Sequence, residues 1–102
     1  MSESDKYLWI FNHFGLENQI EKLKEEFNEL NEAIEENNRE HIVEETADVQ
    51  NVLNQFKVVC ELVKKIYTIT DDELSPVMEF KNDRTLERIN SGYYKKESEI
   101  NG

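Results

Sequence analysis

The sequence has few of the residues that make tight turns or cross-links. Its 3 glycines and 1 proline are too few for the many turns of a β-sandwich or barrel, so we expect a few long helices and an all-α protein. The only cysteine, Cys60, excludes an intrachain disulfide and a cysteine-based zinc site, and its place in an apolar run predicts a buried thiol. No apolar run reaches the roughly 18 residues of a membrane span, and "MSESDKYLWIF" does not have the pattern of a signal peptide. We therefore expect a soluble, cytoplasmic protein.

The chain also has few basic residues. Against 23 acidic residues it has 12 Lys and Arg, which gives a formal net charge of -11. This charge repels a phosphate backbone, so duplex DNA and RNA are disfavoured as partners and cations are favoured. With 37% apolar residues, a chain of 102 residues forms one domain with a thin core, and assembly of several chains would thicken that core.

Apolar periodicity predicts the first three helices. Residues 5–14 form a short aromatic segment that ends at Gly15. From residue 16 to about 37, apolar residues recur at steps of three and four on one helical stripe: Leu16, Ile20, Leu23, Phe27, Leu30 and Ile34. A polar turn near residues 37–40 precedes the longest predicted helix, from about 40 to 67, whose apolar seam includes Ile42, Val49, Val52, Leu53, Phe56, Cys60 and Val63.

The end of the chain is defined by helix start and stop signals. Ser75 and Pro76 have the residue types of an N-cap and a first helical position, so we predict a last helix from there to about Asn90. Gly92 ends it, and residues 93–102 form a polar tail that we expect to be disordered. Residues 1–92 are then a single all-α domain of the four-helix-bundle type.

One carboxylate lies where the helical pattern requires an apolar side chain. Glu45 falls in the seam of the third helix, and Asp48, three residues on, lies on the flank of that seam. An ionised carboxylate in an apolar seam is costly unless a cation compensates it. Glu45 therefore needs a buried basic partner or a metal.

A second pair of acidic residues, Glu26 and Glu29, shares a face of the preceding helix. Helices joined by a short turn run antiparallel, and the two pairs lie about equally far from that turn, so all four carboxylates can meet. Such oxygen ligands suit Mg²⁺, with Mn²⁺ as a substitute. The alternative is a set of solvated surface charges, which we accept for Glu25, Glu32, Glu35, Glu36 and Glu44, although Glu25 and Glu44 adjoin the pairs and could be accessory ligands.

The segments "KLKEEFNELNEAI" and "EETADVQNVL" resemble the two-part signature of the MazG-type all-α nucleoside triphosphate pyrophosphohydrolases, Glu-x-x-Glu followed by Glu-x-x-Asp. The likeness covers roughly residues 13–92. It implies that Lys22 contacts phosphate and that the Mg²⁺ ligands are Glu26, Glu29, Glu45 and Asp48. It also implies basic phosphate contacts on the last helix, where Lys81, Arg84 and Arg88 share one face; the alternative for these three is a surface salt-bridge lattice.

The resemblance implies a Mg²⁺-dependent enzyme that hydrolyses a ribo- or deoxyribonucleoside triphosphate to the monophosphate and pyrophosphate, assembled as a homodimer or homotetramer. Glu29 or a neighbour would be the general base. Side chains that could touch the base or ribose are Trp9, His13, Asn18, Gln19 and Asn51, although the aromatic ones could equally pack the helices. Two alternatives stay open: a phosphoribosyl-ATP pyrophosphohydrolase-like enzyme of the same architecture, and a non-catalytic acidic helical interaction module.

Overall fold

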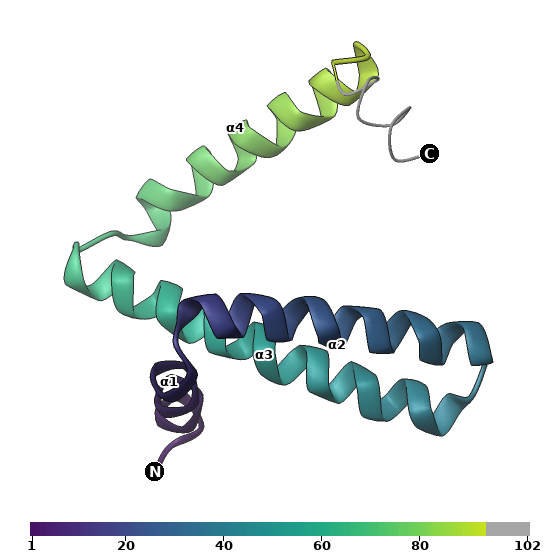
Figure 1. The fold of residues 1–102 in the computed structure, drawn as a ribbon. Coiled ribbons are helices and arrows are strands. Elements are labelled where there is room, and N and C mark those ends of the chain that lie inside the picture. Colours follow the sequence, from purple (N-terminus) through teal and green to yellow (C-terminus); the bar gives the residue numbers. More distant parts are fainter. Residues whose placement is uncertain (94–102) are drawn as a thin grey trace. The chain divides into compact units, whose positions relative to one another are not determined.

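This computed structural model describes residues 1–93, and within that range every regular element is an α-helix, which confirms the all-α prediction (Figure 1). The helices are α1 (Glu3–Phe14), α2 (Leu16–Glu36), α3 (Arg39–Ile66) and α4 (Asp71–Asn90). They form two units: Met1–Lys65 holds α1, α2 and nearly all of α3, and a second unit begins at Ile66. The single domain over residues 1–92 stays a prediction, and residues 94–102 of the predicted tail lie outside the described residues.

The breaks between the first three helices depend on residues that can adopt a positive φ. Gly15, between α1 and α2, has φ 84° and ψ 161°, a conformation that is open almost only to glycine. Asn37 ends α2 in the left-handed region, with φ 56°. Asn38 then begins α3, because its side-chain oxygen accepts a 3.2 Å hydrogen bond from the backbone N–H of His41. The short turn folds α2 and α3 into the antiparallel hairpin seen in Figure 1.

The buried line of α2 is a row of residues spaced by seven, which is about two helical turns. Gln19, Glu26 and Ala33 are 4%, 3% and 0% exposed. The buried residues of α3 are Val49, Val52 and Gln55. The hairpin interface therefore contains amide and carboxylate side chains as well as apolar ones.

The predicted apolar stripe of α2 lies beside this buried line. Ile20, Phe27 and Ile34 each follow a residue of the line, so they are turned about 100° from it around the helix axis. Their exposed fractions are 39%, 47% and 54%. The first unit alone thus leaves an apolar face on α2 uncovered.

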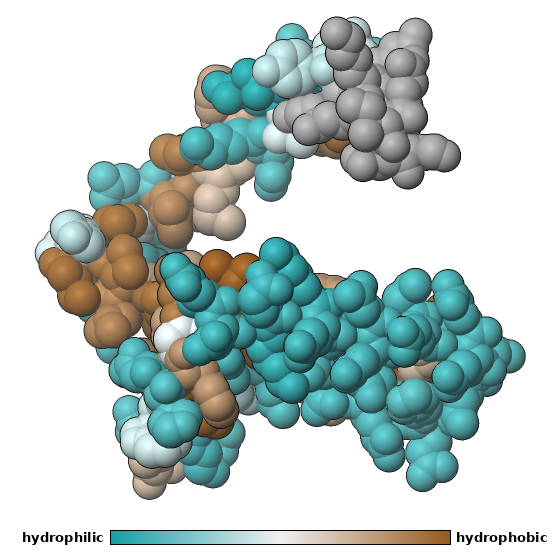
Figure 2. All heavy atoms as spheres, in the orientation of Figure 1, coloured by the Kyte–Doolittle hydropathy of each residue, from teal (hydrophilic) through white to brown (hydrophobic). Residues whose placement is uncertain are grey.

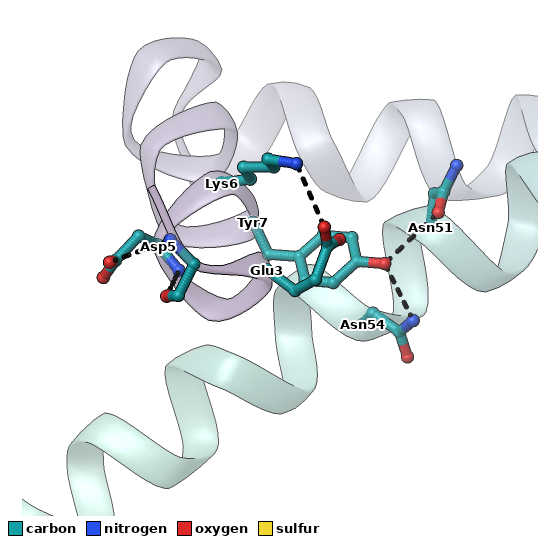
Figure 3. A network of polar contacts seen from close by, with 7 residues as sticks. Glu3, Asp5, Lys6, Tyr7, Asn51 and Asn54 are labelled. Carbon is teal, nitrogen blue, oxygen red and sulfur yellow. Dashed lines mark hydrogen bonds and ion pairs between the residues drawn. The ribbon is translucent and has the colours of Figure 1, made fainter.

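One ring contact and one polar network hold α1 against α3. The ring of Phe11, which is buried, meets the ring of Phe56 edge to face, with centroids 5.5 Å apart. The Tyr7 hydroxyl accepts a 3.2 Å hydrogen bond from the Asn54 amide and donates one of 3.4 Å to the Asn51 side-chain oxygen (Figure 3). These contacts place α1 against the middle of α3.

The prediction of a buried Cys60 is wrong, because this thiol is exposed. Gln19, near the start of α2, contacts Gln55, so the remainder of α3 extends past the end of its partner in the hairpin. No residue of α3 after Gln55 is buried. The apolar run therefore predicted the helix correctly, but it did not show how much of that helix packs against a partner.

α4 starts earlier than Ser75 and Pro76 indicated. Thr70 is its N-cap and accepts a hydrogen bond from the backbone N–H of Glu73, so Pro76 lies inside the helix. The three acidic residues of the first turn, Asp71, Asp72 and Glu73, favour this earlier start through the helix dipole. No residue of α4 is buried, and its exposed apolar side chains include Val77, Met78, Phe80, Leu86 and Ile89.

The visible face of the α2–α3 hairpin is mostly hydrophilic (Figure 2). Hydrophobic residues gather instead at the end of α3, where Leu62, Val63 and Ile66 are exposed. None of the helices in residues 1–93 has a stretch long and apolar enough to span a bilayer.

Candidate metal centre

Four carboxylates, two from each helix of the hairpin, meet at one place. One oxygen from each of Glu26, Glu29, Glu45 and Asp48 lies within 4.8 Å of the others. Two ligands on opposite sides of Mg²⁺ are about 4.2 Å apart, because each Mg–O bond is about 2.1 Å long. The four residues picked out by their spacing therefore form a cluster of nearly the size that a Mg²⁺ or Mn²⁺ site requires.

Two of the four carboxylates contain a buried oxygen without a partner. Glu26 is buried, and the side chain of Glu45 is 13% exposed. In each, Oε2 is buried and has no hydrogen-bond partner among the described residues. An unsatisfied buried carboxylate oxygen is costly, and a divalent cation shared by both residues would satisfy it. The residues present thus fit a hard cation that takes oxygen ligands.

The deepest member of the cluster is Glu26, whereas the helical wheel had singled out Glu45. The difference follows from the way α2 faces its partner. Because α2 turns the line of Gln19, Glu26 and Ala33 inward, Glu26 lies at the centre of the hairpin interface. The sequence argument had put Glu26 at the border of the apolar stripe, and that stripe is not the face that packs against α3.

Repulsion between carboxylates and loss of hydration raise the pKa of two members of the cluster. The negative charge of Glu26, followed by a hydrogen bond with Glu45, raises the pKa of Glu29 above its ordinary value. Loss of hydration, followed by the charges of Glu26 and Glu45, raises the pKa of Asp48. The charge of Lys22 lowers both pKa values but does not offset these causes, and a bound cation would add positive charge to the cluster.

Lys22 connects the cluster to an open pocket. Its Nζ lies 2.9 Å from Oε1 of Glu26, and this hydrogen bond raises the pKa of Lys22. The side chain is half-exposed, so the ammonium group remains accessible. Lys22 also lines a pocket of about 400 Å³ whose other residues are Ile10, Phe14, Asn18, Gln19, Glu21, Glu25, Val52 and Gln55.

The buried side of this pocket presents a pair of amides. Gln19 donates a 2.6 Å hydrogen bond from Nε2 to Oε1 of Gln55, and both side chains are 4% exposed. Because an amide has donors and an acceptor, a pair joined by one hydrogen bond keeps one acceptor and further N–H donors for another group. Gln55 was not singled out from the sequence, although it lies seven residues after Asp48, as Gln19 lies seven before Glu26.

The other predicted substrate contacts of the first unit lie elsewhere. Trp9 is 58% exposed and stacks on His13, with centroids 5.3 Å apart. Asn51 accepts the hydrogen bond from Tyr7. None of these three residues lines the pocket beside Lys22, and none lines a second open pocket, of about 510 Å³, between α1 and the later part of α3.

The other three predicted basic contacts are on α4, in the second unit. Lys81 and Arg84 are exposed, and the guanidinium of Arg88 lies 4.7 Å from the ring centroid of Tyr93. Their spacing places the three on one helical face, as the sequence indicated. Their role toward phosphate stays a prediction.

His41 contacts the cluster and was not among the predicted site residues. Its Nε2 lies 3.3 Å from Oε1 of Glu45, and its Nδ1 lies 3.1 Å from Oε2 of Glu36. The hydrogen bond with Glu36, followed by the charges of Glu36 and Glu45, raises the pKa of His41 despite some loss of hydration. The spacing of four residues between His41 and Glu45 was the available signal, because it puts both on one face.

Comparison with known proteins agrees with this centre. The family model described as phosphoribosyl-ATP pyrophosphohydrolase matches residues 11–65, which include all four carboxylates, Lys22 and His41. No curated protein and no solved structure matches the chain. The family belongs to the MazG-like all-α nucleoside triphosphate pyrophosphohydrolase superfamily, whose signature the carboxylate pairs resemble. Since the match spans more than half of the 102 residues, this chain is a member of the phosphoribosyl-ATP pyrophosphohydrolase family.

Proposed function

We propose that this protein is a Mg²⁺-dependent nucleoside triphosphate pyrophosphohydrolase, which cleaves the bond between the α and β phosphates of a ribo- or deoxyribonucleotide and releases the monophosphate and pyrophosphate. The observation that supports this most is the place of Lys22, which pairs with Glu26 of the carboxylate cluster and also lines the neighbouring pocket. A triphosphate that reached from the pocket to the cluster would pass this ammonium group.

Glu26, Glu29, Glu45 and Asp48 would hold the cation, which when bound neutralises phosphate charge and polarises the phosphoryl group under attack. The ammonium group of Lys22 would leave its contact with Glu26 and bind a phosphate oxygen of the substrate. Glu29 is exposed, so water can reach it, and its carboxylate would accept a proton from that water as the general base. Lys81, Arg84 and Arg88 would contact the departing pyrophosphate.

The pocket beside Lys22 has the composition of a nucleobase site. Ile10, Phe14 and Val52 provide apolar surface for a flat ring, and Gln19 with Gln55 provides hydrogen-bonding groups at its buried side. This assigns base recognition to Gln19 among the predicted residues and adds Gln55. Trp9, His13 and Asn51 would then act outside this pocket, at the ribose or in an assembly.

Phosphoribosyl-ATP is the second candidate substrate, and the family match favours it. The reaction is the same hydrolysis of an α–β phosphoanhydride, so the roles of the carboxylates and Lys22 do not change. The substrates differ in the sugar phosphate attached to the base, which would have to extend out of the open pocket.

Assembly as a homodimer or homotetramer is the second part of the proposal. The apolar face of α2 is uncovered within the first unit, and α4 has apolar side chains but no buried residue. A second copy of the chain that covered the α2 face would enlarge the thin core.

The test is to incubate the full chain with Mg²⁺ and a panel of nucleoside triphosphates and phosphoribosyl-ATP, and to measure pyrophosphate. Glu45→Ala removes a cluster ligand, and Glu32→Ala removes an exposed glutamate outside the cluster. We expect release that needs Mg²⁺, persists in Glu32→Ala and is lost in Glu45→Ala. Release unaffected by Glu45→Ala would contradict the metal centre, and no release from any substrate, without thermal stabilisation by Mg²⁺, would favour the acidic interaction module.

A further inference from the structure

His41 joins the turn of the hairpin to the carboxylate cluster. It is the third residue of α3, and its backbone N–H is held by the side chain of Asn38. Its ring lies between two carboxylates, with Nδ1 3.1 Å from Glu36 at the end of α2 and Nε2 3.3 Å from Glu45 in the cluster. Each ring nitrogen therefore faces a different carboxylate, one at the end of α2 and one within α3.

The two oxygens of Glu45 have different surroundings. Oε1 faces Nε2 of His41, whereas Oε2 is buried and has no hydrogen-bond partner among the described residues. The contact with Oε1 is at ion-pair distance, and because a carboxylate can only accept a hydrogen bond, Nε2 attracts Oε1 through its own N–H. Oε1 thus faces His41, and the buried Oε2 without a partner is the oxygen available to a cation.

We propose that His41 is a positioning residue that fixes the rotation of the Glu45 carboxylate, so that Oε2 is presented to a divalent cation. The proposal deepens the metal-dependent function proposed above and rests on it. Groups that hydrogen-bond to metal ligands set the orientation of those ligands, and their loss commonly weakens metal binding by about 10–100-fold. Glu36 in turn orients His41, because it occupies the other ring nitrogen.

A purely structural alternative assigns His41 to the turn alone. In that case the contact with Glu36, which joins the end of α2 to the start of α3, is the one that matters. The two roles can be separated because they use different ring nitrogens. An asparagine amide reaches about as far as Nδ1, and a glutamine amide reaches about as far as Nε2.

The experiment compares His41→Asn with His41→Gln. The first keeps a donor for Glu36 and loses the one for Glu45, and the second does the reverse. Isothermal titration of Mn²⁺ alone into the full chain gives the affinity, and melting in EDTA gives the stability of the metal-free fold. We expect His41→Asn to bind Mn²⁺ about 10–100-fold more weakly than the wild type, and His41→Gln to stay within about threefold of it.

A further variant removes the other partner of the ring. Glu36→Gln leaves the contact between His41 and Glu45 in place, so its Mn²⁺ affinity is expected to match the wild type. The proposal is overturned if His41→Asn binds Mn²⁺ as tightly as the wild type, or if His41→Gln binds as weakly as His41→Asn. Absence of Mn²⁺ binding by the wild type would instead overturn the metal centre itself, and this inference with it.

Discussion

Gln19 of α2 and Gln55 of α3 are joined by a 2.6 Å hydrogen bond in the same register that brings Glu26 opposite Asp48. Gln19 lies seven residues before Glu26, and Gln55 lies seven residues after Asp48. In an antiparallel hairpin these equal steps make the amide pair and the carboxylate pair two layers of one interface, about two helical turns apart. A buried polar contact therefore aligns the two halves of the proposed metal centre.

The first prediction concerns this amide pair. Gln19→Met or Gln55→Met alone leaves one buried amide without its partner and is expected to lower the free energy of unfolding by about 1–3 kcal/mol. The double variant is expected to recover most of this loss, because both polar groups are then removed. Urea unfolding of the wild type, the two single variants and the double variant gives the four free energies of this double-mutant cycle. Equal and additive losses would contradict the hydrogen bond as the source of stability.

The same double variant tests base recognition. If the pair binds the nucleobase, the double variant should raise the KM for the nucleotide by about tenfold or more, because one or two hydrogen bonds are lost. Its Mn²⁺ affinity should not change. An unchanged KM would place the base outside this pocket.

The second prediction concerns the charge of Glu29 in the metal-free protein. Its pKa is raised in the folded state, so the folded protein binds a proton at Glu29 more tightly than the unfolded chain does. The stabilisation from this group is complete below the unfolded pKa and is lost as the pH rises through the folded pKa. Glu29→Gln is uncharged at every pH, so in EDTA it should melt above the wild type at about pH 7.5, and the difference should shrink toward about pH 4.

Glu32→Gln is the matched control, because Glu32 is an exposed glutamate of the same helix outside the cluster. By scanning calorimetry, the difference in Tm between this variant and the wild type should be about the same at both pH values. With excess Mg²⁺ the order should reverse, since the wild type gains stability from the ion and Glu29→Gln gains less. A lower Tm for Glu29→Gln at both pH values in EDTA would contradict the repulsion within the cluster.

The third prediction concerns the uncovered face of α2. Phe27 is 47% exposed on that face, so Phe27→Glu should disrupt an assembly that covers it. Light scattering after gel filtration should give a dimer or tetramer mass for the wild type and a monomer mass for this variant. Val43→Glu, at an exposed apolar residue of α3, is the control and should keep the wild-type mass. A monomeric wild type would contradict the proposed assembly.

The fourth prediction concerns the basic face of α4. Replacing Lys81 and Arg84 together by alanine should lower kcat/KM by about 10–100-fold, the size expected for losing one or two charge-assisted hydrogen bonds to phosphate. Lys6→Ala is the control, because Lys6 pairs with Glu3 on the exposed side of α1, away from the pocket beside Lys22. If kcat/KM stays the same in the double variant, these residues are surface charges, as the salt-bridge alternative holds.

The sequence predicted the all-α fold and the meeting of the four carboxylates because both depend on local spacing. Pairs three residues apart share a helix face, and the short turn at Asn37 and Asn38 fixes the antiparallel pairing that brings Glu26 and Glu45 together. No long-range information is needed for either result. The start of α4 was missed because Pro76 was taken as a first residue, whereas Thr70 gives a capped start one turn and a half earlier.

Which face each helix buries was harder to predict, because this depends on the partner. Hydrophobicity alone placed Phe27 and Ile34 inside, but the hairpin buries the neighbouring line through Glu26 and leaves the apolar stripe half-exposed. The prediction of a buried Cys60 was wrong for a related reason, because α3 extends past the N-terminal end of α2 at this residue. His41 was missed because its role depends on two carboxylates whose positions only the folded hairpin defines.

The central claim is that the cluster built around Glu26 and Glu45 holds a divalent cation, and the most direct measurement is a calorimetric titration of Mn²⁺ into the wild type, Glu26→Gln and Glu32→Gln. Glu26→Gln keeps the shape of the side chain and removes the charge of the most buried ligand. We expect saturable binding by the wild type and Glu32→Gln, and binding at least about 100-fold weaker by Glu26→Gln. Equal binding by all three proteins, or none by the wild type, would contradict this claim.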